Sequence, residues 1–226
     1  MKFKEFFDNV YASSKAPYFG DKPSEELEDY VLMTKIHGKA LDIGCGNGRD
    51  TLFLAANGFC VTAIDTSKVA LQKLMQFARS LGLEKKVNPI QCDARYWNYP
   101  NSFFDLVTSA TCLDHIPKKD LTSLLQKITM CLKPEGILFL EVHTVDDPGF
   151  GKTTGRVSEL SSVILHYFRH NELLRLVEPE FYIVRYEEKI EEDRDHGELH
   201  VHGFANVLSK RVDNRKKRGL LEESPK

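Results

Sequence analysis

The sequence predicts an α/β fold: a single domain with a doubly wound, mostly parallel sheet of seven strands that ends in an antiparallel hairpin. Short apolar runs alternate with segments of helical periodicity, which is typical of a parallel sheet covered by helices on both faces. In addition, three glycines at alternate positions, Gly44, Gly46 and Gly48, follow the first apolar run. Glycines allow a tight turn in which the backbone approaches a ligand closely.

The first predicted strand, residues 39–43, ends at this glycine turn, and a helix over about 49–57 begins beyond it. A second apolar run predicts a strand at 60–64. The next helix is expected over 67–82, because Ser67 can cap its N-terminus and apolar residues then recur at helical spacing.

Two further apolar runs predict strands at 87–91 and 104–109. A helix over 119–132 follows, and Lys133-Pro134-Glu135-Gly136 has the composition of a turn that leads into a fifth strand at 136–142.

Beyond residue 143 the pattern loosens, and residues 144–157 are expected to form a long loop, of the kind that covers functional sites. A helix over about 170–177 and two strands, 180–188 and 199–209, then complete the sheet as its antiparallel hairpin.

The chain is expected to have three parts: an N-terminal helical or lid segment (1–34), the α/β domain (35–210) and a polar tail (211–226) whose Lys- and Arg-rich composition predicts disorder.

The composition is that of one soluble domain. The 226 residues suffice for a sizeable core, and a formal net charge of −2 predicts no general attraction to nucleic acid or to a membrane. No apolar run approaches the length of a membrane-spanning helix, and the first residues lack the apolar core of a signal peptide. The five cysteines are scattered without a Cys-x-x-Cys pair, which favours a reducing, cytoplasmic location.

The glycine turn and the end of the second strand predict a site for an adenosine-bearing cofactor. Asp65 follows Gly44 by 21 residues, which is the length of one strand–turn–helix–strand unit, and a carboxylate there can accept hydrogen bonds from ribose hydroxyls. A dinucleotide fingerprint needs its third glycine at position 49, which is Arg49, whereas the third glycine here is Gly48. The spacing therefore favours a cofactor without a pyrophosphate.

Asp42-x-Gly44-x-Gly46-x-Gly48 resembles motif I of the class I S-adenosylmethionine-dependent methyltransferases. Gln91-Cys92-Asp93-Ala94 resembles their adenine motif, 104–109 their fourth-strand motif, and 132–136 the turn before their fifth strand. The resemblance covers about residues 35–209 and implies a Rossmann-like methyltransferase fold that binds S-adenosyl-L-methionine. The cofactor residues that it implies are Asp42, Gly44, Gly46, Gly48, Asp65, Thr66, Asp93, Ala94 and Ser109.

Within this superfamily, the sequence is similar to the tellurite-resistance TehB-type methyltransferases at residues 46–50, 53–58 and 61–65, and again at 186–188, 196–200 and 204–210. The stretch 111–116 departs from that group, and it resembles the Leu-x-His-Ile variant of small-molecule methyltransferases in general.

Candidate catalytic residues follow the fourth and fifth strands, where the acceptor must approach. Asp114 and His115 come after strand four, and His143 ends strand five. A histidine can remove a proton from a hard acceptor such as an amine or hydroxyl, whereas a soft anion needs only positioning. In the alternative interpretation, His115 packs under the cofactor, Asp114 caps a turn, and His143 is a solvated loop residue.

Candidate substrate residues are Tyr18 and Phe19 in the N-terminal segment, His166 and Arg169 before the last helix, and His200 in the final hairpin. The aromatic pair either forms a lid or packs on the outer sheet. His166 and His170 would share one face of a helix that starts early, and that face either meets an anionic acceptor or is plain surface.

The richest histidine cluster is the segment 196–202. His200 and His202 would share one face of a strand, and with a third histidine nearby they could bind a metal. Because methyl transfer from this cofactor needs no metal, we expect substrate-facing or surface histidines and no metal.

These observations predict a methyltransferase whose partner is a small-molecule methyl acceptor, such as a thiol, a metalloid oxyanion or another soft nucleophile. One alternative is a protein or RNA methyltransferase that docks through the basic segment 210–218. Another is a non-catalytic cofactor-binding module. We expect neither membrane nor nucleic-acid partners, and the oligomeric state is left open.

Overall fold

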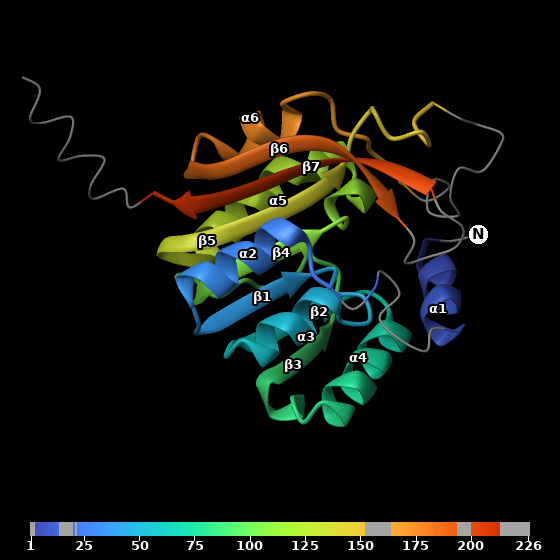
Figure 1. Ribbon diagram of the computed structural model, residues 1–226, viewed down its shortest axis with the longest axis vertical. Helices are drawn as coiled ribbons and strands as arrows, with labels where there is room; N and C mark the ends of the chain where they lie inside the picture. The colour runs from blue at the N-terminus through green and yellow to red at the C-terminus, as the bar shows by residue number, and fades with distance from the viewer. Residues whose placement is uncertain (1–2, 14–19, 21, 152–163, 194–199, 213–226) are drawn as a thin grey trace, which may run out of the picture.

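Seven strands form one sheet in the computed structural model, which describes residues 3–13, 20, 22–151, 164–193 and 200–212 (Figure 1). The strand order is β3-β2-β1-β4-β5-β7-β6. Their bounds are β1 Lys39–Ile43, β2 Cys60–Asp65, β3 Val87–Gln91, β4 Phe104–Ala110, β5 Leu132–His143, β6 Phe181–Asp193 and β7 His200–Arg211. β1 to β5 pair in parallel, and β7 runs antiparallel between β5 and β6. The predicted fold class is therefore confirmed.

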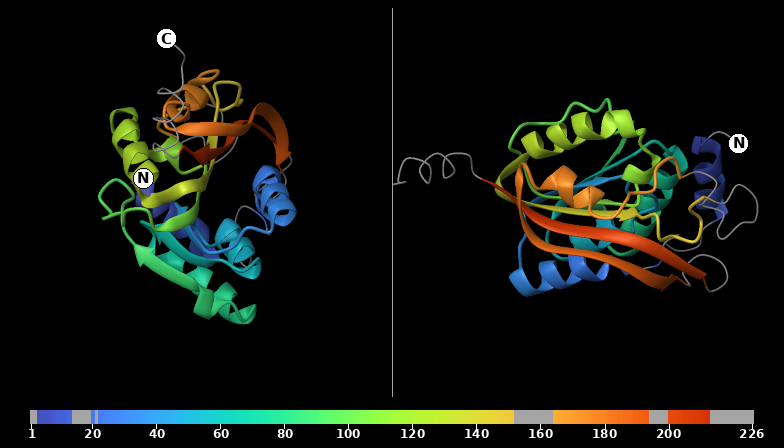
Figure 2. Two further views of the ribbon diagram at one scale, coloured as in Figure 1. Left: turned by 90° about the vertical axis from the view of Figure 1, so that its left-hand side faces the viewer. Right: turned by 90° about the horizontal axis from the view of Figure 1, so that it is seen from above.

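Helices cover both faces of the sheet, as Figure 2 shows for α2 and α5. One face packs on α5 (Lys118–Cys131) and α6 (Glu172–Val177), and the other on α2 (Glu25–Thr34), α3 (Arg49–Ala56) and α4 (Lys68–Ser80). Strand residues alternate between the two cores because successive side chains of a strand point to opposite faces. Leu41, for example, joins the first core and Ala40 the second.

The predicted start of α4 is confirmed in detail. The hydroxyl oxygen of Ser67 accepts a hydrogen bond from the Ala70 N–H at 3.0 Å, so Ser67 is the N-cap. Helix α1 (Phe3–Ser13) packs on α4 through a small cluster of Phe7, Tyr11 and Ala70, and the Ser67 hydroxyl donates to Asp8 at 2.5 Å. The N-terminal segment is thus attached beside the carboxyl end of β2.

The predicted turn at residues 133–136 is wrong. β5 begins at Leu132, and its register with β4 jumps from Phe104–Leu132 to Leu106–Ile137, so these residues form a bulge inside the strand pair. Glu135 has a φ of 66°, and a side chain on Gly136 would lie 2.8 Å from the Lys133 carbonyl oxygen. Turn composition at this point therefore marks an irregular strand rather than its beginning.

Within the described residues, none of the helices combines the length and the apolar character that crossing a bilayer requires. Two further short helices complete the described fold, η1 (Glu84–Lys86) and η2 (Leu113–His115). The division of the chain at residues 34 and 210 stays a prediction. Helix α2 nonetheless buries Leu27 and Val31 in the same core as α3 and α4.

Candidate active site

A cavity opens at the carboxyl ends of β1, β2 and β4, and it encloses about 1140 Å³ including its mouth. β1 lies between β2 and β4, whose crossovers run to opposite sides, and such a switch point is where parallel α/β sheets bind ligands. In Figure 1 the arrows of β1 and β5 point toward the same end, where α1 lies. Eight of the site residues predicted from the sequence line this cavity: Asp42, Gly44, Gly46, Asp65, Thr66, Asp93, Ala94 and His115.

The glycine turn forms the floor of this cavity. The N–H groups of Gly44 and Cys45 donate to the Ile64 carbonyl oxygen at 2.9 and 3.1 Å, which holds the turn against the end of β2. A Cβ atom on Gly46 would lie 2.7 Å from the Tyr11 hydroxyl, and one on Gly44 would collide with Cys112. Only bare backbone fits between these side chains and leaves the cavity open.

Asp65 presents its carboxylate at the edge of the turn. One oxygen accepts the Gly46 N–H at 2.9 Å and the other accepts the Ser67 N–H at 2.8 Å. Burial raises the pKa of Asp65 despite these bonds. Each carboxylate oxygen has a second lone pair, so a ligand hydroxyl can bind here without displacing the backbone donors.

Asp93 is already paired within its own loop. Arg95 Nη2 donates to its carboxylate at 2.7 Å, which lowers the pKa of Asp93, and Arg95 also reaches Asp120 at 3.3 Å. An adenine amine at this position would share the carboxylate with Arg95. Ala94 lies beside it in the lining.

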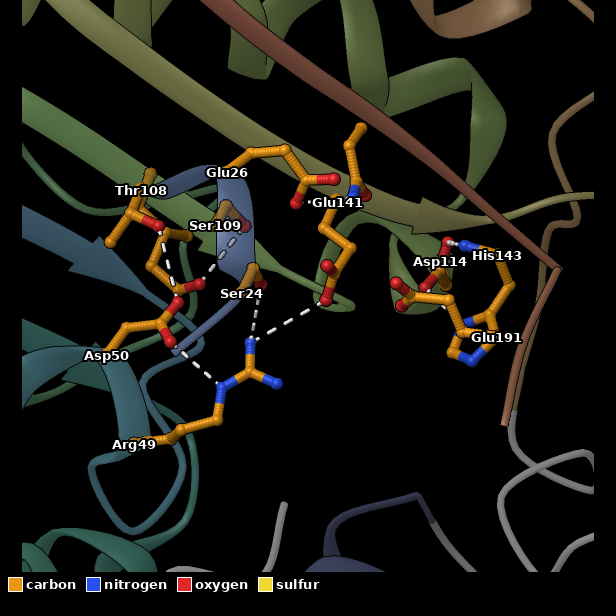
Figure 3. A network of polar contacts seen from close by, with 12 residues as sticks. Ser24, Glu26, Arg49, Asp50, Thr108, Ser109, Asp114, Glu141, His143 and Glu191 are labelled. Carbon is orange, nitrogen blue, oxygen red and sulfur yellow. Dashed lines mark hydrogen bonds and ion pairs between the residues drawn. The ribbon is translucent and has the colours of Figure 1, made fainter. Parts of the chain in front are cut away.

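A largely buried ionic network reaches the cavity through Arg49 and Asp50, and the sequence interpretation missed most of it (Figure 3). Arg49 donates to Asp50 at 2.9 Å and to the Ser24 hydroxyl at 3.1 Å, and it lies 3.6 Å from Glu141. Arg49 and Asp50 both line the cavity. The charged pair directly after the glycine turn was the available signal.

Asp42 lines the cavity beside this network, near the end of β1. Thr51 Oγ1 donates to its carboxylate at 2.5 Å. Burial, with the neighbouring charge of Asp50, raises the pKa of Asp42 to about 8. A cationic ligand group would stabilise the ionised form of this carboxyl.

Helix α1 forms the outer wall, and the sequence interpretation did not assign its aromatic residues to the site. Phe7 lies edge-on to His115 with ring centroids 5.3 Å apart, and it stacks on Tyr11 at 5.8 Å. Both aromatic residues line the cavity. The predicted lid residues Tyr18 and Phe19 lie outside the described residues.

Of the three predicted catalytic residues, only His115 lines the cavity. The neighbouring Asp114 accepts hydrogen bonds from the backbone N–H of His143 at 3.0 Å and from its Nδ1 at 2.8 Å. His143 is 3% exposed and is therefore a buried residue, not a solvated one. Burial by itself lowers the pKa of His143. The charge of Asp114 and its hydrogen bond raise that pKa by more, so the net pKa lies above the ordinary value of a histidine.

Two predicted cofactor residues lie behind the cavity. Gly48 precedes α3, and a side chain there would collide with Leu74 of α4. The Ser109 hydroxyl is buried and donates to the Ile43 carbonyl oxygen at 3.1 Å. Both contacts hold the sheet and helices beneath the glycine turn, and a direct cofactor contact stays a prediction for each.

The predicted substrate residues of the last crossover lie elsewhere. The prediction that one helix carries His166 and His170 on the same face is wrong, because α6 starts only at Glu172. His166 lies 3.4 Å from the Glu172 carboxylate, and the Arg169 N–H donates to the same group at 3.0 Å. Neither residue lines the cavity. His200 begins β7, and its side chain lies outside the described part.

Comparison with known proteins finds a methyltransferase domain in the chain. Residues 40–136 match a methyltransferase domain model. The chain is 33% identical over 123 residues to a ubiquinone biosynthesis O-methyltransferase of Haemophilus ducreyi, a match that covers 48% of each protein. The chain thus spans about half the length of the curated relatives that it matches.

Two solved structures share the fold. TehB from Haemophilus influenzae has a TM-score of 0.69 at 18% identity, over 93% of this chain and 67% of that one. A Burkholderia thailandensis 1,6-didemethyltoxoflavin-N1-methyltransferase, solved with S-adenosylhomocysteine and its substrate, has a TM-score of 0.68 at 19% identity, over 93% and 87%. Residues 40–136 therefore carry a methyltransferase domain, and the chain as a whole has the fold of the class I S-adenosylmethionine-dependent methyltransferases.

Proposed function

We propose that this protein transfers the methyl group of S-adenosylmethionine to a small-molecule acceptor. The observation that carries the proposal is the gathering of Asp42, the glycine turn, Asp65 and Asp93 around one cavity at the switch point of the sheet. These residues come from four separate segments of the chain, and each was expected from its motif to contact a different part of this cofactor.

The residues present fit this cofactor. The turn at Gly44 and Gly46 leaves no room for side chains but admits a ligand against the backbone. Asp65 can accept ribose hydroxyls while it keeps its two backbone donors. The buried carboxylates of Asp42 and Asp50 suit the positively charged methionine end.

When bound, S-adenosylmethionine supplies an electrophilic methyl group on a positively charged sulfur. The chain's own residues then orient and enclose the reactants. Phe7, Tyr11 and Ile116 present apolar surface to the cavity, which excludes water from the reacting atoms. Helix α1 would thus cover one side of the bound cofactor, and the lid role of Tyr18 and Phe19 stays a prediction.

His115 is the candidate base for a hard acceptor, because its ring lines the cavity whereas Asp114 and His143 do not. A thiol or metalloid oxyanion acts as a soft nucleophile and would not need this base. We propose such a soft acceptor, which the segments similar to the TehB-type methyltransferases support.

The test is an acceptor panel with methyl-labelled S-adenosylmethionine. Labelled product from thiols or metalloid oxyanions that also forms with His115→Gln would support the soft acceptor. A methylated hydroxyl or amine that forms only with His115 present would show a hard acceptor instead. Transfer to protein or RNA alone would support the macromolecular alternative. Tight cofactor binding without any product would support the non-catalytic module.

A further inference from the structure

A second cluster of titratable side chains lies beside the cavity rather than in it. One ligand atom from each of His143, Asp147 and His202 lies within 4.8 Å of the other two, and all three residues are buried. They come from the end of β5, the loop after it, and β7. We propose that these three residues form a binding site for a divalent first-row transition-metal ion, with Zn²⁺ as the reference ion.

The chemical type of the ligands supports this assignment. Two imidazoles and one carboxylate suit zinc and iron(II) in proteins, with bonds of about 2.0–2.2 Å. Such bonds put ligand atoms roughly 3.4 Å apart in a tetrahedral site. Around an ion, His202 Nδ1 and Asp147 Oδ2 would have to move apart from their present 2.7 Å, and no pair of the three ligand atoms starts more than 4.8 Å apart.

The surroundings of the histidines also resemble those of metal ligands. Asp114 Oδ2 lies 2.8 Å from His143 Nδ1 (Figure 3). When Nδ1 carries the proton, this bond leaves Nε2 as a lone-pair donor and fixes the orientation of the ring. His202 Nδ1 lies 2.7 Å from Asp147 Oδ2, and an ion held by these two atoms would replace that hydrogen bond.

The charge of the cluster favours a dication. Asp114 and Asp147 are 0% and 3% exposed, and metal-bound imidazoles are neutral, so the loaded site would bury two negative charges beside the ion. Glu191, the cross-strand neighbour of His202, already has the ammonium of Lys189 at 2.5 Å. Buried charge is costly unless it is paired, and one divalent ion neutralises the surplus.

The backbone packs closely where the loop meets β7. The Asp147 carboxylate accepts the Gly149 N–H at 2.7 Å and the Gly203 N–H at 3.3 Å. A side chain on Gly203 would lie 2.5 Å from the Asp147 nitrogen. An ion here would therefore join β5, β7 and the intervening loop. The ion would also be linked to η2, because its ligand His143 contacts Asp114 there, and the residue after Asp114 is His115, which lines the cavity.

The first experiment uses tag-free, metal-stripped wild-type protein and Zn²⁺ or Co²⁺ alone. We expect one equivalent to bind in calorimetry and Co²⁺ to give visible absorption bands. With ¹⁵N-labelled histidine, Zn²⁺ should shift two of the eight histidine ring signals in slow exchange. Absence of binding would overturn the proposal with the wild-type protein alone. So would two histidine rings whose signals remain at imidazolium positions in excess Zn²⁺.

The second experiment locates the ion. His202→Asn keeps a donor for Asp147 but removes the imidazole, and Asp147→Asn removes the carboxylate charge. We expect each to weaken Co²⁺ affinity at least tenfold. His170→Asn is the matched control, because His170 also places Nδ1 2.7 Å from a carboxylate, that of Glu188, outside the cluster. Equal affinity in all four proteins would refute the site. Methyl transfer is not measured, so failure of the proposed function leaves this result unaffected.

Discussion

Asp65 accepts two backbone N–H groups and still faces the cavity. Asp65→Ala would remove the acceptor for ligand hydroxyls, and we expect the affinity for S-adenosylmethionine to fall by about 1–3 kcal/mol. Isothermal titration calorimetry measures the change. Asp29→Ala, at an exposed position of α2, is the control and should bind as the wild type does. Unchanged affinity in Asp65→Ala would refute the ribose assignment.

The raised pKa of Asp42 makes stability depend on pH. An unfolded aspartate titrates near pH 4, whereas burial and Asp50 bring the folded value to about 8. Between these values the folded state holds a proton that the unfolded state has released. The free energy of unfolding therefore falls as pH rises from about 4 to 8.

Asp42→Asn tests this dependence, because the amide keeps an acceptor oxygen for the Thr51 hydroxyl and cannot ionise. Relative to its difference from the wild type at pH 5, we expect the variant to gain on the order of 4 kcal/mol at pH 8.5, because each of the roughly three pH units up to the folded pKa contributes about 1.4 kcal/mol. Thermal unfolding without cofactor, followed by circular dichroism at both pH values, measures it. Parallel pH profiles of the two proteins would contradict the assigned pKa.

At the scale of elements, α1 has the most direct effect on the site. Tyr11 is 4% exposed, stacks on Phe7 and lines the cavity. We expect Tyr11→Ala to weaken S-adenosylmethionine binding by about 1 kcal/mol, since one aromatic contact is lost. Calorimetry measures the loss, and circular dichroism confirms the fold.

Tyr182→Ala is the matched control, because that ring is 69% exposed on β6. The same loss of affinity in both variants would show that α1 does not act as a cover. A loss in Tyr11→Ala alone would locate the effect at the cavity.

The elements that the sequence predicts well are those with local causes. Gly44 and Gly46 need positive φ, and Ser67 caps the helix that follows it, so composition alone marks these boundaries. The role of α1 has no such signal. The sequence predicts a helical or lid segment there, but only the packing of α1 on α4 brings Phe7 and Tyr11 over the cavity.

The direction of side chains in irregular segments also could not be predicted from the sequence. Asp114 and His115 are adjacent in η2, yet one contacts His143 and the other faces the cavity. A short 3-10 helix has no periodicity from which this division could be read. The same holds for His143 and His202, which are distant in sequence and meet only because β7 pairs with β5.

At the scale of the whole molecule, the small-molecule proposal predicts that the basic tail is dispensable. Ending the chain after Val212 keeps all of β7, which finishes at Arg211. We expect the truncated protein to bind S-adenosylmethionine and to methylate its small acceptor within about twofold of the full chain. A small acceptor needs no basic docking arm, and the net charge of −2 gives the full chain no general attraction to nucleic acid.

Radiolabel transfer and calorimetry on both chains measure this. A circular dichroism spectrum shared by the two proteins is the control for folding. Loss of transfer with intact cofactor binding would favour the macromolecular acceptor instead.

The place of β7 between β5 and β6 has a consequence for biosynthesis. A ribosome delivers the strands in sequence order, so β6 leaves the exit tunnel before β7, with which it pairs. Until residues 200–211 follow, β5 and β6 both present unpaired edges, and such edges promote aggregation. The nascent sheet is therefore most vulnerable just before β7 is released, and β7 then pairs with β5 and β6 together.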